Sequence, residues 1–98
     1  MVSARVKHYA QREHLIPGRI RITDAKTCLG SCGYRGTLNF CWRLVLAPLW
    51  VVDYVVAHEL AHLVERNHSR KFWQKVETIF PDYKKAHEWL KTNNLIFL

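Results

Sequence analysis

Residues 51–68 read VVDYVVAHELAHLVERNH and combine the spacing of a buried helix with three histidines. Apolar residues recur every three or four positions along two sides of this segment. Proline is tolerated in a first helical turn, where its missing N–H is not needed, so Ala47 and Pro48 mark the expected start. The pattern predicts a helix that runs to about Arg66 and is buried on both sides.

His58, Glu59 and His62 follow the spacing HExxH within this helix. Residues four apart on a helix lie one above the other, so His58 and His62 point the same way and can share one metal ion. Glu59 lies about 100° round from His58 at 3.6 residues per turn. This places Glu59 beside the ion as a general base for the attacking water.

His68 is a third candidate ligand, although a continuous helix would turn it roughly 240° away from His62. Asn67 can adopt the left-handed conformation that stops a helix, and Ser69 can cap the next one. We therefore expect a sharp turn that carries His68 back to His58 and His62. Three histidine nitrogens with one open position are typical of hydrolytic zinc sites, so the predicted cofactor is Zn²⁺.

The three histidines and Glu59 allow two other interpretations. In the first, the two helix histidines are buried and hydrogen-bonded to Glu59, and His68 is merely exposed. In the second, the ligand spacing is that of a metzincin, whose motif has a glycine three residues after the second histidine and a methionine turn. Here that position is Glu65 and the only methionine is Met1, which excludes the metzincin interpretation.

The remaining sequence predicts an α+β domain. The chain has 98 residues, 49% of them hydrophobic, which suits a single domain spanning residues 1–98 that buries roughly 65% of its unfolded surface. A short helix is expected over the first fifteen residues, starting near Ser3. Alternating patterns predict strands at 19–22 and 37–46, paired antiparallel across a glycine-containing loop that has room for a further short strand. Helical segments follow from the Ser69 cap, with a break at Pro81.

Composition narrows the location and partners of the protein. The N-terminus has no continuous apolar stretch, so we expect no secretory signal and a cytoplasmic location. Pro48 and Asp53 interrupt the longest apolar segment, which argues against a membrane span. Three cysteines cannot form a closed disulfide framework, and Cys28 and Cys32 lack the second thiol pair of a zinc knuckle.

The net charge of +7 makes nucleic acid a candidate partner, because basic residues gather after residue 65. A solvated helix face is the more ordinary interpretation, since no DNA-reading motif accompanies the charges.

The sequence resembles the YgjP-like metallopeptidases, relatives of the SprT-like zincins, from about Ile20 to Leu90. The resemblance implies a zincin-like core, in which a small antiparallel sheet packs against the HExxH helix and C-terminal helices. It also implies zinc on His58, His62 and His68, with Glu59 as general acid/base. The family-like blocks are GSC at 30–32, LNFCWRLVLAP at 38–48, VVDYVVAHELAHL at 51–63, NHSRKFW at 67–73, PDY at 81–83 and WL at 89–90.

The sequence departs from this family in two respects. Members usually carry an additional N-terminal β-rich part, so the resemblance implies a minimal or excised catalytic domain. They also tend to have Arg-Trp before Gly-Ser-Cys, where this chain has Cys28 and Leu29. The departure puts in doubt a substrate-positioning role for that loop.

Peptide hydrolysis is the leading functional hypothesis. A peptide or protein substrate would lie extended beside a sheet edge, for which the predicted strand from Thr37 to Leu46 is the candidate. Stabilisation of the developing oxyanion has four candidate residues, among which the sequence does not choose. They are Arg43, Tyr54, Tyr83 and His87.

Two alternatives stay open at this point. The first is a metal-dependent phosphohydrolase acting on nucleotides, although no phosphate-cradling glycine loop precedes a helix. The second is a nucleic-acid-binding module that zinc only stabilises. Replacement of Glu59 by Gln distinguishes a hydrolase from a binding module. A hydrolase would keep its metal and lose turnover, whereas a binding module would be unaffected.

Overall fold

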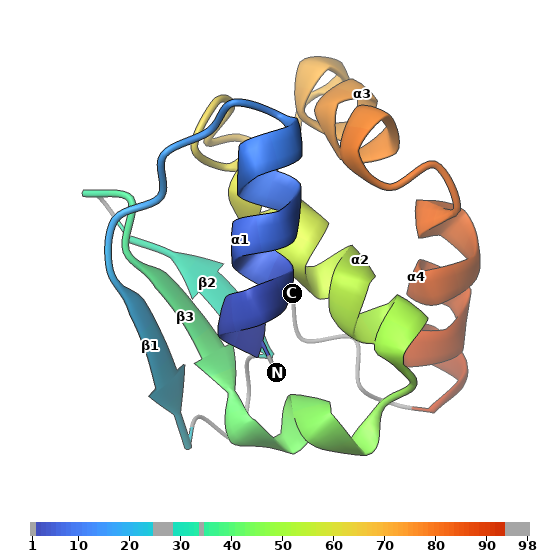
Figure 1. Cartoon of the computed structure of the whole chain (residues 1–98). Helices are drawn as coiled ribbons and strands as arrows, with labels where there is room; N and C mark the ends of the chain where they lie inside the picture. Colours follow the sequence, from blue (N-terminus) through green and yellow to red (C-terminus); the bar gives the residue numbers. More distant parts are fainter. Residues whose placement is uncertain (1, 25–28, 34, 94–98) are drawn as a thin grey trace.

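A three-stranded sheet and four α-helices make up the fold in the computed structural model, which describes residues 2–24, 29–33 and 35–93 (Figure 1). Figure 1 shows the sheet on one side of the molecule and the helices gathered on the other. The elements in order are α1 (Val2–Arg12), β1 (Ile20–Thr23), β2 (Gly30–Cys32), β3 (Leu38–Cys41), the 3₁₀-helix η1 (Trp42–Leu46), α2 (Leu49–Ala61), α3 (Arg70–Ile79) and α4 (Tyr83–Thr92).

The sheet is mixed, with strand order β1-β3-β2. β1 pairs with β3 in parallel, Ile20 opposite Leu38, and β2 pairs with β3 antiparallel. The α+β class is therefore confirmed, but the expected antiparallel pairing of the two flanking strands is wrong. The short strand inside the glycine-containing loop supplies the antiparallel partner, and this leaves β3 in the centre.

The strand predicted at 37–46 is shorter than its alternating pattern suggests. It ends at Cys41, and Trp42–Leu46 form η1 instead. Leu44 is buried, whereas Leu46 is 75% exposed. Ile22 on edge strand β1 is also 57% exposed, against the expected buried face. The side chain of Ile22 lies in a shallow depression beside the first turn of α1, which does not extend far enough to cover it.

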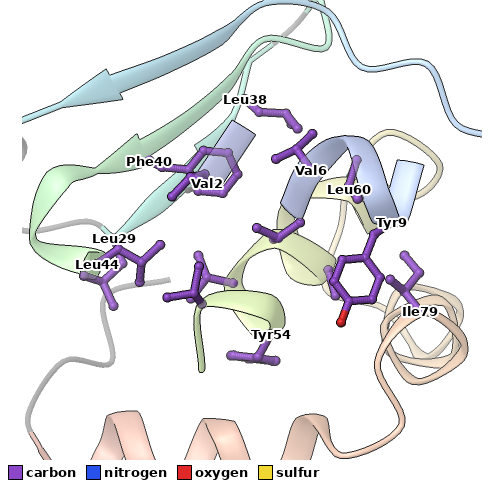
Figure 2. Close-up of a cluster of buried hydrophobic side chains, with 14 of the residues drawn as sticks. Val2, Val6, Tyr9, Leu29, Leu38, Phe40, Leu44, Tyr54, Leu60 and Ile79 are labelled. Carbon is purple, nitrogen blue, oxygen red and sulfur yellow. The ribbon is translucent and has the colours of Figure 1, made fainter. Parts of the chain in front are cut away.

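The helix α2 forms the centre of the hydrophobic core (Figure 2). All of its residues from Val51 to Ala61 are buried, as the two-sided pattern predicts. The predicted N-terminal helix is confirmed as α1, whose buried face includes Val6 and Tyr9. Figure 2 shows Val6 near Leu38 of β3 and Tyr9 near Ile79 of α3. None of the helices in the described part of the chain is long and apolar enough to cross a bilayer.

A buried carboxylate joins α1 to α2. Arg5 donates from Nε and Nη2 to the two oxygens of Asp53, both at 2.7 Å, and the Tyr9 hydroxyl lies 3.0 Å from Asp53 Oδ2. Asp53 is only 6% exposed, so its charge needs these partners. The hydrogen bond to Asp53 raises the pKa of Arg5, which therefore stays charged. The ion pair between Arg5 and Asp53 fixes the position of α1 on the core.

The helix α2 ends at Ala61, earlier than the predicted end near Arg66. The next residues form turns tightened by hydrogen bonds three positions apart, such as Val64 N to Ala61 O at 3.0 Å. The left-handed conformation expected for Asn67 is also wrong. Among the described non-glycine residues, positive φ occurs at His14.

Arg5→Ala should lower the free energy of unfolding by roughly 2 kcal/mol, because it leaves the Asp53 carboxylate buried without its guanidinium. Lys7→Ala is the matched control, since Lys7 is exposed on the same helix, and it should change stability by less than about 0.5 kcal/mol. Urea unfolding of both variants measures the difference. Equal midpoints for the two variants would contradict the anchoring role of Arg5.

Candidate metal centre

Three histidines from two segments lie together at the end of α2. His58 lies in the last turn of α2, His62 caps it, and His68 follows the turn after it. Each offers one ring nitrogen, and these nitrogens lie within 4.8 Å of one another. The ring centroids are 4.9 to 5.3 Å apart. The structure thus brings the three predicted ligands to one point.

The start of α3 holds His68 in place. Ser69 is the N-cap, and its Oγ accepts a hydrogen bond from Phe72 N at 3.3 Å, as the sequence predicts. The first turns of α3 then present aromatic rings to the histidines. Phe72 stacks on His62 at 4.4 Å, and the Trp73 ring lies 5.7 Å from that of His58.

Hydrogen bonds orient two of the imidazoles. His62 Nδ1 lies 3.1 Å from the backbone oxygen of Glu65, which suits the tautomer that leaves Nε2 for an ion. His58 Nδ1 lies 3.2 Å from Glu59 Oε2. Burial lowers the pKa of both His62 and His68. A lowered pKa favours the neutral imidazole, which is the form that binds metal.

These residues fit a metal ion by the chemistry of their donors. Three imidazoles suit zinc, and a pocket of about 320 Å³ opens beside them. The pocket leaves room for water and a substrate at the ion. Its lining comprises Gly30, Ser31, Cys32, His58, Glu59, His62, Arg66 and His68.

Glu59 is buried against strand β2, with an exposed fraction of 1%. Gly30 makes this approach feasible. A Cβ at position 30 would lie 3.1 Å from Glu59 Oε2 and 3.2 Å from both Glu59 Cγ and Val55 Cγ1. The absence of a side chain on Gly30 therefore lets the strand pass directly over the carboxylate.

Strand β2 is the sheet edge next to the histidines. Cys41 N donates to Leu29 O and Gly33 N donates to Thr37 O, so residues 29 and 33 turn their backbone groups toward β3. The backbone groups of Gly30 and Cys32 consequently face the outer edge. The expected edge at 37–46 is wrong, because β3 lies between β1 and β2.

Arg66 links the turn after α2 to this edge. Its guanidinium donates to Cys32 O and Gly33 O, both at 3.3 Å. The contact joins the segment that carries His62 and His68 to the strand that covers Glu59.

The four candidate oxyanion stabilisers fall in two places. The Tyr54 hydroxyl lies 3.3 Å from His87 Nδ1, and Tyr83 stacks on Trp73 beside them. Burial raises the pKa of Tyr54, which keeps its hydroxyl protonated. Arg43 lies in η1, before the opposite end of α2, and forms an ion pair with Asp24 at 2.9 Å.

Several residues at this site were missed from the sequence. A short strand was expected inside the glycine-containing loop, but the approach of Gly30–Cys32 to Glu59 was not, and its glycine gave the available signal for this approach. Phe72 and Trp73 could have been found as paired aromatics just after a helix cap. Arg66 had no such signal. Cys28, and with it the zinc-knuckle interpretation, lies outside the described residues, while Leu29 is buried.

An HExxH helix, a third histidine after a turn and an adjoining edge strand define the class of HExxH metallopeptidases. Residues 1–93 match the YgjP-like metallopeptidase domain, and the chain belongs to this family. Its members act on peptides with a metal ion. None of the curated proteins compared matches the sequence significantly.

Two solved structures share the fold. One is the metallopeptidase zymogen of Pyrococcus abyssi abylysin, with a TM-score of 0.83 and 26% identity over 95% of this chain and 94% of that one. The other is the metallopeptidase zymogen of Methanocaldococcus jannaschii jannalysin, with a TM-score of 0.80 and 20% identity over 98% of both chains. The family and the first structure confirm the metallopeptidase hypothesis over the two alternatives drawn from the sequence.

Gly30→Ala should lower kcat by roughly ten- to a hundredfold, because the new methyl group displaces the Glu59 carboxylate by a few tenths of an ångström or more. Metal content should stay at the wild-type level, since the three atoms nearest to the new methyl group belong to Glu59 and Val55 and not to the imidazoles. Gly33→Ala is the control on the same edge, because its Cβ would meet Thr37 at an ordinary 3.5 Å. Equal peptidase rates for the two variants would show that Glu59 tolerates the methyl group.

Proposed function

We propose that the chain hydrolyses peptide bonds with a zinc ion held by His58, His62 and His68, and with Glu59 as general acid/base. The convergence of three imidazoles beside a buried carboxylate is the observation that supports this proposal. Zinc is the proposed ion because three imidazoles and one open side form its usual hydrolytic donor set.

A zinc ion held by the three imidazoles would supply Lewis-acid polarisation of the scissile carbonyl and would acidify the attacking water. Glu59 takes the proton of that water and later delivers it to the leaving amine nitrogen. Its Oε2 is already within 3.2 Å of His58 Nδ1, so we assign the proton transfer to Oε1. Burial on α2 and against Gly30 keeps the carboxylate in one orientation.

The substrate in this proposal lies extended along the outer edge of β2. Strand β2 is an edge of the sheet and lines the pocket beside the histidines, and a sheet edge is where an extended peptide adds as a further strand. Arg66 holds the far end of the same edge through Cys32 O. A strand fixed at this position would bring the scissile carbonyl beside the three imidazoles.

Oxyanion stabilisation is assigned in this proposal to the side of the site formed by Tyr54 and His87. Their hydrogen bond lies beside His58, whose ring centroid is 6.0 Å from that of Tyr54. Arg43 is committed to Asp24 near the other end of α2.

Two further expectations stay predictions. Cys32 carries a free thiol, which supports a reducing, cytoplasmic location. The net charge of +7 supports contact with nucleic acid, separately from catalysis.

Glu59→Gln should retain stoichiometric zinc and lose at least about a hundredfold in kcat, because the amide cannot accept the proton. His68→Ala should lose most of the zinc, since two imidazoles hold the ion weakly. Metal analysis and cleavage of a quenched fluorescent peptide measure both effects. The control is His8→Ala, an exposed histidine on α1, which should behave as the wild type.

Stoichiometric zinc in His68→Ala would remove the third ligand from the proposal. Undiminished turnover by Glu59→Gln would remove the general base.

A further inference from the structure

Residues of α3 and α4 line a second pocket. Figure 1 shows these two helices next to each other on one side of the molecule. The volume of the second pocket is about 460 Å³, within the range of pockets that bind small ligands. The lining residues are Trp73, Tyr83, Lys84, His87 and Glu88.

Trp73 is the wall that this pocket shares with the metal centre. Its ring centroid lies 5.7 Å from that of His58 and 6.1 Å from that of His68. Tyr83 stacks on the same indole at 5.7 Å, and the His87 ring lies 6.3 Å away. A single indole therefore separates the proposed ligands from the second pocket.

The lining selects for a flat or apolar group. Trp73 and Tyr83 are nearly parallel, at 25°, and offer aromatic faces. The Tyr54 hydroxyl holds His87 through Nδ1 at 3.3 Å. Lys84 and Glu88 are exposed, so the charges sit toward solvent and are of opposite sign. The pocket thus has apolar walls and a charged rim with little net charge.

We propose that this pocket binds an aromatic or long apolar side chain of the peptide substrate, at a residue flanking the cleaved bond. The inference rests on the proposed function and adds the side-chain class that the enzyme selects. The observation that carries it is that Trp73, a wall of this pocket, contacts the rings of His58 and His68.

Cleavage of matched peptides tests the selectivity. The peptides are identical except for Phe, Ala, Lys or Asp at each of the two positions flanking the cleaved bond. The wild type should prefer Phe to Ala at one position by roughly 10- to 100-fold in kcat/KM, and should disfavour Lys and Asp there.

A pocket-blocking variant and its control refine this test. Glu88→Trp places a ring at the rim and should reduce the ratio of Phe to Ala cleavage to below about threefold. Lys85→Trp is the matched control, because Lys85 is exposed on the same helix and is not a lining residue. It should keep the wild-type ratio. An unchanged ratio in Glu88→Trp would overturn the proposal.

Binding without turnover separates the pocket from the chemistry. Zinc-loaded Glu59→Gln protein is titrated with N-acetylphenylalanine amide, N-acetylalanine amide or adenosine monophosphate. NMR follows the Trp73 indole N–H, identified by its loss in Trp73→Phe. The phenylalanine amide should shift this signal at concentrations at least about tenfold below those the alanine amide requires.

Each result decides between the two proposals. Peptide cleavage without a Phe preference, and without a shift at Trp73, overturns the pocket and leaves the proposed function standing. A Trp73 shift by the phenylalanine amide without peptide cleavage supports the pocket and overturns the proposed function. A shift by the nucleotide in place of the phenylalanine amide overturns the apolar side-chain assignment.

Discussion

The structure depends on a helix that is buried on every side and still carries ionisable groups. Asp53, His58 and Glu59 all lie on α2, with exposed fractions of 6%, 3% and 1%. A charge in such a position is costly unless a partner compensates it. Arg5 and Tyr9 compensate Asp53, which docks α1. At the other end of α2, His58 lies beside Glu59 and strand β2 closes over them. The partners of the buried charges are thus also the contacts that position neighbouring elements.

The position at which α2 ends brings the three histidines of the candidate metal site together. Because the helix stops at Ala61, the chain turns before it would carry His68 past the imidazoles. The Ser69 cap then starts α3 at once, and its first aromatic residues pack on the histidines. Arg66 fastens the same turn to β2. The geometry of the candidate ligands therefore rests on the turn and on contacts that come from outside the HExxH motif.

Local signals account for what the sequence could predict. The burial of α2, the shared face of His58 and His62, and the Ser69 cap follow from helical spacing and capping chemistry. The predictions that proved wrong depend on tertiary contacts. Helix α2 was expected to reach Arg66, but that side chain instead bonds the edge of β2. A strand of three or four residues has too short an alternating pattern to predict which strands it pairs with. The prediction that β3 is an edge strand was therefore wrong. Leu46 alternates as in a strand, yet the chain must turn there to enter α2, which leaves this side chain in solvent.

Trp73 connects substrate selection to the metal centre, since its ring contacts those of His58 and His68 on one side and Tyr83 on another. A group that enters the second pocket contacts this indole, which in turn contacts two of the three imidazoles. In the proposed function, α2 carries the catalytic residue and β2 aligns the peptide. The proposed selection of a substrate side chain is made by α3 and α4, which line the second pocket. The start of α3 also holds His68 in place. Changes on α4 can then alter specificity while the HExxH helix stays intact, whereas a change at Trp73 alters specificity and metal binding together.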